Sequence, residues 1–178
     1  ALKEDTLSTV KQLRLFKQTI LSGDAEVNVN AIGNLLDIPS RHAQCSPKDK
    51  LQIVSYFQTQ GDRVLMLGDG INDSPVLAQA NVSVSVGNAS DLAKNASDIL
   101  FLHPSIAPLP LLIALAQRCK TVVKQNFMWA LGYNLLILPF GIAGYLTPWM
   151  AALGMSLSSI IVVYNSSRLL SFQSTGKF

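Results

Sequence analysis

The last part of the sequence contains a long stretch without charge: no Asp, Glu, Lys or Arg occurs between Gln125 and Ser167. Residues 127–145 and 149–169 are each about 20 residues long, the length that an α-helix needs to cross the hydrocarbon core of a bilayer. The stretch therefore predicts two transmembrane helices joined by a short turn. Two buried helices of a soluble protein are the alternative interpretation.

Basic residues flank this stretch, and the turn between the two predicted spans carries none. Because basic residues next to a span favour the cytoplasmic side, we expect both ends of the segment to face the cytoplasm. These residues account for most of the net charge of +3, which gives no reason to expect nucleic-acid binding. They are Arg118, Lys120 and Lys124 before the first span, and Arg168 and Lys177 after the second.

The two cysteines, Cys45 and Cys119, lie far apart and form no Cys-x-x-Cys pair. Neither a disulfide framework nor a self-contained metal site is therefore indicated. The sequence begins without an initiator Met and without the basic and apolar regions of a signal peptide. We expect it to be a segment of a longer protein.

Ahead of the charge-free stretch, helical and extended patterns alternate. Apolar residues spaced by three or four positions predict helices over residues 6–16 and 27–36, and a cap residue followed by proline begins another helix at Ser46-Pro47. Strands that alternate with helices predict an α/β fold with a parallel, Rossmann-like sheet that helices cover on both faces. The predicted strands are residues 18–21, 63–67, 82–86 and 99–102.

Four regions follow from these patterns. Residues 1–104 form the α/β domain, and residues 105–126 form an amphipathic coupling helix that continues into the first span. Residues 127–170 form the two transmembrane helices, and residues 171–178 form a cytoplasmic tail.

An acidic turn, Gly68-Asp69-Gly70-Ile71-Asn72-Asp73, directly follows the predicted strand at residues 63–67. Open α/β sheets build their sites at the carboxyl ends of parallel strands. Two carboxylates four positions apart on a glycine-rich turn can both approach one Mg²⁺ ion, which prefers oxygen ligands. Asp69 is the candidate direct ligand, with Asp73 and Asn72 in support; an ordinary Gly-Asp-Gly turn is the alternative.

Ser22 and Lys50 are candidates for binding a phosphate. Ser22 ends another predicted strand, so its hydroxyl and the neighbouring N–H groups can hold a phosphate oxygen, to which Lys50 adds a positive charge. Taken singly, Ser22 is better explained as a helix N-cap and Lys50 as a solvated surface lysine. Only their occurrence together with the acidic turn predicts a phosphoryl-transfer pocket, and that pocket lacks a nucleophile.

Residues 66–100, together with the order Ser22-Gly23-Asp24, Pro47-Lys48-Asp49-Lys50 and the acidic turn, closely resemble P-type ATPases and their haloacid dehalogenase-like relatives. The resemblance implies that Ser22 and Lys50 contact an aspartyl phosphate, that Asp69 holds Mg²⁺, and that Asn72 and Asp73 complete the site. It also implies ATP as the phosphate donor, bound by a nucleotide domain outside this chain.

The predicted spans contain Tyr133-Asn134 and Met155-Ser156-Leu157-Ser158-Ser159, and this pairing resembles the last two helices of Cu(I)-transporting members. The sequence departs from the usual family pattern at Asn81 and at Gly87-Asn88-Ala89-Ser90. These departures, together with Trp129-Ala130-Leu131-Gly132, faintly resemble the subset of copper ATPases that supply cytochrome oxidase assembly. A thioether suits Cu(I), and polar residues inside a membrane are costly unless they pair or line an ion path. The candidate path residues are Met155, Tyr133, Asn134 and Ser159; hydrogen bonding and packing between helices are the alternative roles.

We therefore expect part of an integral membrane pump of a bacterial plasma membrane, with the rest of the pump, membrane lipid and a copper chaperone as partners. The segment alone should be inactive. Two other classes of function stay open: a membrane-anchored phosphatase of the same superfamily, and a truncated pump segment with a binding or modulatory role. Zn(II) is the alternative cargo, but it favours an intramembrane acid, and the predicted spans contain none.

Overall fold

The computed structural model describes residues 4–68, 73–87 and 97–170. The chain divides into two compact units, Ala1–Pro110 and Leu111–Phe178. The candidate Mg²⁺ ligand Asp69 and its neighbour Asn72 lie outside the described residues.

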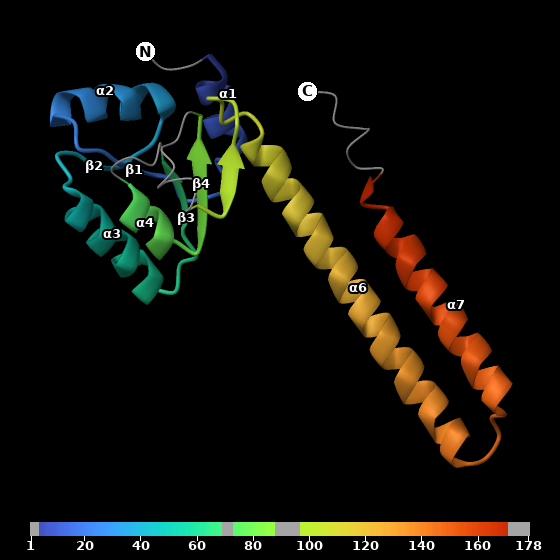
Figure 1. Ribbon diagram of the computed structural model, residues 1–178. Helices are drawn as coiled ribbons and strands as arrows, with labels where there is room; N and C mark the ends of the chain where they lie inside the picture. The colour runs from blue at the N-terminus through green and yellow to red at the C-terminus, as the bar shows by residue number, and fades with distance from the viewer. Residues whose placement is uncertain (1–3, 69–72, 88–96, 171–178) are drawn as a thin grey trace. The chain divides into compact units, whose positions relative to one another are not determined.

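The first unit is an α/β structure in which every strand pair is parallel (Figure 1). One sheet has the strand order β1-β2 and the other has the order β3-β4-β5. The strands are β1 (Thr19–Leu21), β2 (Ser40–His42), β3 (Leu65–Gly68), β4 (Val82–Val86) and β5 (Ile99–Phe101). The helices are α1 (Glu4–Gln12), α2 (Glu26–Leu36), α3 (Pro47–Thr59) and α4 (Ser74–Gln79).

The α/β fold with parallel strands is confirmed, but it is split into two sheets where the sequence predicts one. Within the described residues, β1 pairs with β2 alone and β3 pairs with β4 alone, so each of these two strands has one edge without a partner strand. The two sheets share a core, because Leu21 of β1 packs against the cluster that contains Met66 of β3.

That core joins the second sheet to two helices. Val54 of α3, Met66 of β3, and Val76 and Leu77 of α4 are all buried and form one apolar cluster. Burial of a side chain of this size contributes about 1.5 to 3 kcal/mol, so the cluster fixes α3 and α4 beside β3. These three elements carry the candidate site residues Lys50 and Asp73.

The start of α3 follows the prediction. Ser46 is the N-cap and Pro47 occupies the first turn. The Ser46 hydroxyl accepts the Asp49 N–H at 3.2 Å, while the Ser46 N–H donates to Asp49 Oδ2 at 2.9 Å, which completes a capping box. Hydrogen bonds from the Ser46 hydroxyl and then from the Ser46 N–H lower the pKa of Asp49.

Two elements differ from the prediction. The helix α1 ends at Gln12, and Phe16, where the predicted helix ends, is 48% exposed, so the apolar spacing does not continue as a buried stripe to that residue. The strand β2 was not predicted, because Ser40-Arg41-His42 has no apolar pattern. This strand is held instead by pairing with β1. It is also held by a hydrogen bond that Arg41 Nη1 donates to Asn34 Oδ1 of α2, at 2.7 Å.

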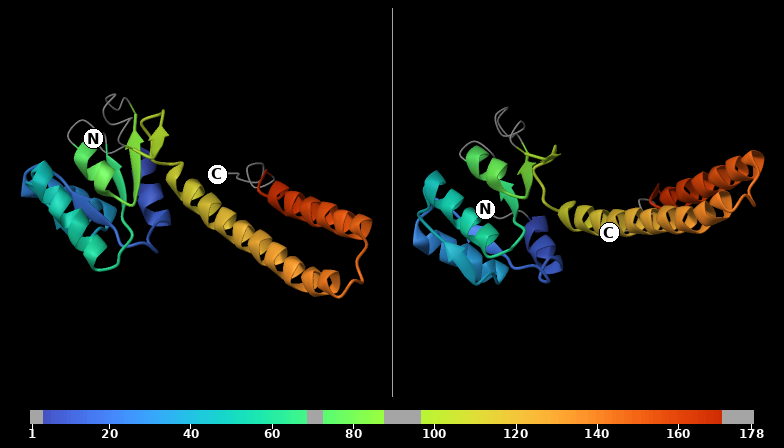
Figure 2. Two further views of the ribbon diagram at one scale, coloured as in Figure 1. Left: turned by 60° about the horizontal axis from the view of Figure 1, so that its bottom comes forward. Right: turned by 90° about the horizontal axis from the view of Figure 1, so that it is seen from below.

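Two long helices make up most of the second unit: α6 (Leu109–Ile142) and α7 (Pro148–Ser167). They run antiparallel and are joined by a short turn (Figure 2). Residues 109–142 are one unbroken helix of 34 residues, α6, which runs across the predicted boundary at residue 126.

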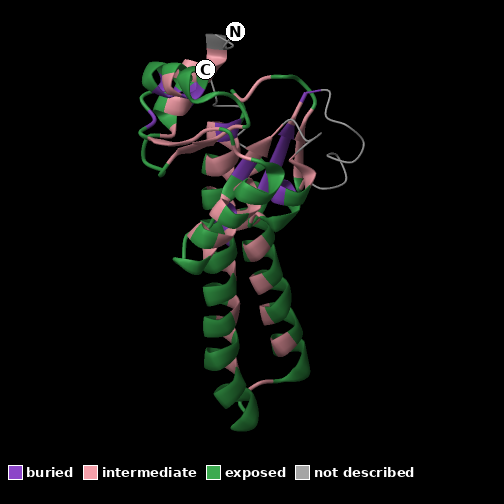
Figure 3. Cartoon of the chain, turned by 90° about the vertical axis from the view of Figure 1, so that its left-hand side faces the viewer, coloured by how far each residue is buried: buried purple, intermediate pink, exposed green. Residues whose placement is uncertain are grey.

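From residue 126 onward, the two helices face each other along one stripe each, and most of the rest of their surface is exposed (Figure 3). Half-buried residues recur every three or four positions, at 126, 130, 133 and 137 of α6 and at 151, 154, 158, 162 and 165 of α7. Large apolar side chains such as Leu135, Ile142 and Leu157 are more than half exposed. Among the described helices, only α7 is long and apolar enough to be a candidate span, so the predicted two-helix hairpin across a membrane is not confirmed.

Candidate functional site

The structure brings together two of the predicted site residues, Lys50 and Asp73. The Lys50 Nζ donates to Asp73 Oδ1 at 2.7 Å, and the two side chains are only 12% and 14% exposed. Lys50 lies in the first turn of α3, and Asp73 is the residue before α4. A lysine in this position is not the solvated surface residue of the alternative interpretation, because its charge is matched inside the fold.

Gly68, the last residue of β3, makes room for the Asp73 carboxylate. A Cβ at position 68 would lie 3.1 Å from Asp73 Oδ2 and 3.3 Å from Asp73 Cβ. Those distances are tighter than ordinary contacts, so a side chain at this position would push the carboxylate away from the end of the strand. The first glycine of the acidic turn therefore has a steric role beside the site.

The donor chemistry at this strand end fits a divalent cation. Asp73 offers carboxylate oxygens, the ligand type that Mg²⁺ prefers, although the Lys50 ammonium already neutralises this group. Asp73 is thus engaged by Lys50. The described residues contain no group of three or more His, Cys, Asp or Glu side chains that could hold a metal ion, and Asp69, the candidate direct ligand, lies outside them.

Ser22 follows β1 and is held within its own loop. Its hydroxyl donates to Asp24 Oδ2 at 3.1 Å and accepts the Asp24 N–H at 3.2 Å. The Ser22 N–H donates to the His42 carbonyl at 3.0 Å, and the Cys45 N–H donates to the Ser22 carbonyl at 2.9 Å. Ser22 is not the N-cap of α2, because Ala25 occupies that position. These bonds connect the segments that follow β1 and β2.

A second set of predicted residues meets between α6 and α7. Tyr133 and Met155 both line a pocket of about 300 Å³, together with apolar residues such as Ile137 and Leu146. The Tyr133 hydroxyl oxygen is buried, and within residues 4–68, 73–87 and 97–170 it has no hydrogen-bond partner. The structure thus gathers a thioether and an unpaired hydroxyl in one apolar pocket.

The other two predicted path residues lie differently. Asn134 is exposed, and Ser159 donates its hydroxyl to the Met155 carbonyl at 3.0 Å, one turn earlier in α7. The Ser159 bond ties this side chain to the backbone of the residue that carries the thioether.

Sequence reasoning missed a group of amides that joins the two helices near residue 126. Asn165 Nδ2 donates to Asn126 Oδ1 at 2.9 Å and to Gln125 Oε1 at 3.2 Å, and Asn126 Nδ2 donates to Ser166 Oγ at 2.9 Å. Gln125 and Asn126 precede the first predicted span, and Asn165 and Ser166 lie 40 positions later, so only the antiparallel pairing of the helices reveals the contact.

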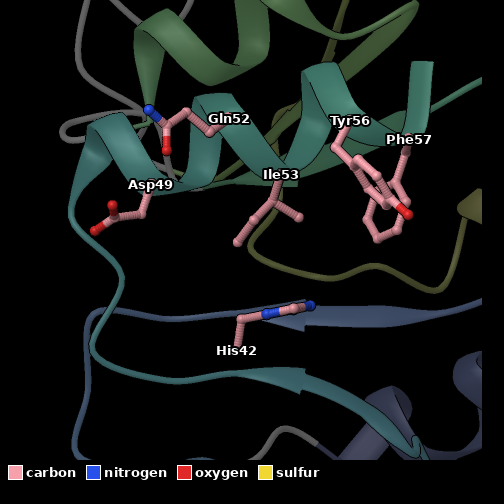
Figure 4. Close-up of a pocket in the computed structure, with 6 residues that line it drawn as sticks. All are labelled: His42, Asp49, Gln52, Ile53, Tyr56 and Phe57. Carbon is pink, nitrogen blue, oxygen red and sulfur yellow. The ribbon is translucent and has the colours of Figure 1, made fainter. Parts of the chain in front are cut away.

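A larger pocket, of about 450 Å³, lies between β2 and α3 (Figure 4). His42 lies across from Ile53, and the rings of Tyr56 and Phe57 line one end. Asp49 lines the other end, but its carboxylate is engaged by Ser46. This pocket is mainly apolar, and it contains neither the Lys50–Asp73 pair nor Ser22, so we assign it no part in phosphate chemistry.

Residues 1–81 match the family model "haloacid dehalogenase-like hydrolase". The chain is 43% identical over 153 residues to the nitrogen fixation protein FixI of Rhizobium leguminosarum bv. viciae, covering 86% of this chain and 20% of the relative. It is 36% identical over 169 residues to a copper-exporting P-type ATPase of Staphylococcus saprophyticus, covering 94% of this chain and 21% of the relative.

Among solved structures, a zinc-transporting PIB-type ATPase in the E2·Pi state has a TM-score of 0.88 and 27% identity to this chain. The match covers 96% of this chain and 28% of that chain. The chain therefore spans about a fifth of the length of its curated relatives and aligns along most of its own length. On these grounds the chain is homologous to P-type ATPases over most of its length, and its first 81 residues match a haloacid dehalogenase-like hydrolase.

Proposed function

We propose that this chain is part of an ATP-driven pump that moves Cu(I) across a bacterial plasma membrane through an aspartyl-phosphate cycle. Ser22 and Lys50 would contact the phosphate, and Asp69 would hold Mg²⁺ with Asn72 and Asp73 in support. The phosphate-binding part of this proposal rests on the Lys50–Asp73 pair, which places a lysine at the carboxyl end of β3 beside the acidic turn. ATP binding and the phosphorylated aspartate would belong to the remainder of the pump.

Within the described residues, β1 and β3 each have one edge without a partner strand, which leaves room for a strand from outside the chain that carries the nucleophile. One further parallel strand between β1 and β3 would hydrogen-bond to both and join the two sheets into one. Its carboxyl end would lie near the ends of β1 and β3, which carry Ser22 and the acidic turn, because parallel strands end at one edge of a sheet. We assign the phosphorylated aspartate to that position.

The chemistry of the phosphate site is electrostatic. A bound Mg²⁺ would neutralise charge on the phosphoryl oxygens. Lys50 adds a fixed positive charge on a rigid helix, and Asp73 holds its ammonium in one place before the phosphate arrives. The Ser22 hydroxyl, already oriented by Asp24, donates to a phosphoryl oxygen in place of the Asp24 carboxylate.

Cu(I) is favoured as cargo by the pocket between α6 and α7. Met155 would supply a soft thioether ligand, and Tyr133 would supply a hydroxyl that has no hydrogen-bond partner among the described residues. The stretch from Gln125 to Ser167 contains no carboxylate, the group that a Zn(II) path would favour. The solved relative is described as zinc-transporting, so Zn(II) is the competing cargo.

The exposed surface of α6 and α7 favours a membrane. Each helix packs on its partner through one stripe and exposes large apolar side chains elsewhere, and lipid would cover these. The chain would cross the membrane twice, with both ends in the cytoplasm, where a copper chaperone delivers the ion. In a membrane-anchored phosphatase, by contrast, the nucleophile would lie within this chain.

The test is metal-stimulated ATPase activity of the complete pump in lipid, with Cu(I), Ag(I), Zn(II) or no metal, for the wild type and Met155→Ala. We expect stimulation by Cu(I) and Ag(I) that Met155→Ala weakens by about tenfold or more, because a ligand is lost. Stimulation by Zn(II) alone would contradict Cu(I) as the cargo. Hydrolysis of small phosphate esters by the chain alone would favour the membrane-anchored phosphatase.

A further inference from the structure

Tyr133 crosses from α6 to the backbone of α7 at Gly154. A Cβ atom at position 154 would overlap the Tyr133 hydroxyl oxygen and would lie 3.4 Å from Cζ and 3.8 Å from Cε2 of the ring. The conflict is therefore with the hydroxyl, while the ring atoms would remain at ordinary contact distance. Any side chain at position 154 would displace the hydroxyl from where it lies.

Among the described glycines of the second unit, only Gly154 shows this close approach. At Gly132, next to Tyr133 on α6, an added Cβ would meet nothing within 4 Å. At Gly141 it would meet only a side-chain carbon of Leu146, at 3.8 Å. Gly154 thus makes room for the Tyr133 hydroxyl, and Gly132 provides a matched control.

The stability of the helix pair does not explain where the hydroxyl lies. It is buried and has no hydrogen-bond partner in the described part of the chain, and such a group is costly in an apolar environment. A phenylalanine would fill the same space without that cost. The hydroxyl lies beside the residue that precedes Met155, and both side chains line one pocket.

We propose that Gly154 is a positioning residue for the transported ion: its lack of a side chain lets the Tyr133 hydroxyl reach α7 beside Met155, unpaired and available to the ion. This inference rests on the proposed function, in which Tyr133 and Met155 belong to the ion path. An alanine at position 154 keeps both groups and changes only their placement.

The experiment measures ATPase activity of the complete pump in lipid against the concentration of Ag(I), a soft ion of the same charge as Cu(I). The variants are Gly154→Ala, Tyr133→Phe, the double variant and the control Gly132→Ala. The half-saturating Ag(I) concentration should rise about tenfold or more in Gly154→Ala and in Tyr133→Phe, and less than about twofold in Gly132→Ala. The double variant should equal Tyr133→Phe, because the hydroxyl that Gly154 positions is then absent.

An unchanged half-saturating concentration in Gly154→Ala, with metal stimulation intact, would overturn the inference and leave the proposed function standing. A further rise in the double variant above Tyr133→Phe would also overturn it, because Gly154 would then act through something other than the hydroxyl. If Gly154→Ala fails to accumulate in the membrane, recovery in the double variant supports the steric contact and its absence refutes it. A wild-type pump that no metal stimulates would overturn the proposed function and this inference together.

Discussion

Lys50 and Asp73 are 23 positions apart in the sequence, and the fold makes them an ion pair 2.7 Å long. With exposures of 12% and 14%, each side chain has lost most of its contact with water. If either side chain is removed, the other keeps its charge in a largely buried position where water cannot solvate it at low cost. The pair therefore matters to the fold as well as to the proposed phosphate binding.

Lys50→Met should lower the free energy of unfolding by about 3 kcal/mol, because it leaves the Asp73 carboxylate largely buried without a counter-charge. Arg14→Met is the matched control: its ion pair with Asp37 is 2.9 Å long, but the side chains are 58% and 77% exposed. An exposed pair contributes less than about 1 kcal/mol. Thermal unfolding of the chain in detergent measures both, and equal losses would refute the structural role of the Lys50–Asp73 pair.

At the scale of elements, the capping box makes the start of α3 depend on the charge of Asp49. Hydrogen bonds from Ser46 lower the pKa of Asp49 below the ordinary value of 3.8. A lowered folded-state pKa means that the stabilisation is fully present above the unfolded pKa and is lost as the pH falls through the lowered value. Acid should therefore weaken this helix end.

The unfolding midpoints of wild type and Asp49→Asn should differ at neutral pH and converge as the pH falls below 3.8. The comparison isolates Asp49, because the other carboxylates titrate alike in both proteins. A difference that stays constant over this pH range would show that the Asp49 charge does not hold the helix end.

The α6–α7 pair is joined by the amide group around Asn165. Asn165→Ala removes the two hydrogen bonds to Asn126 and Gln125 and should cost about 1 to 2 kcal/mol, because each bond between helices in lipid contributes about 0.6 kcal/mol on average. Ser156→Ala is the control, since Ser156 donates only to the Ala152 carbonyl of its own helix. Unfolding in bicelles measures both, and an equal effect would contradict the bridging role of Asn165.

Elements with a strong local signal could be predicted from the sequence. The strand β4 at residues 82–86 and the start of α3 at Ser46-Pro47 agree with prediction, because apolar runs and capping residues act locally. The strand β2 was missed, since three polar residues become a strand only by pairing with β1. The candidate residues could likewise be named, but the Lys50–Asp73 pair and the Tyr133–Gly154 contact depend on how separate elements pack.

The two units of the molecule differ in charge and in the chemistry proposed for them. The first unit carries the polar groups proposed for the phosphate, and the stretch from Gln125 to Ser167 in the second has no charged residue. In the first unit, β1 of one sheet and β3 of the other each have an edge without a partner strand within the described residues. The chain is homologous to a copper-exporting P-type ATPase over most of its length. Under the proposed function, phosphorylation needs an aspartate outside this chain.

The proposed aspartyl-phosphate cycle is tested by incubating the complete protein in lipid, and separately this chain alone, with ATP labelled at the γ-phosphate and measuring acid-stable phosphoenzyme. The complete protein should take up label that hydroxylamine removes, as expected of an acyl phosphate. This chain alone should take up none. Label on the chain alone, or no label on the complete protein, would contradict it.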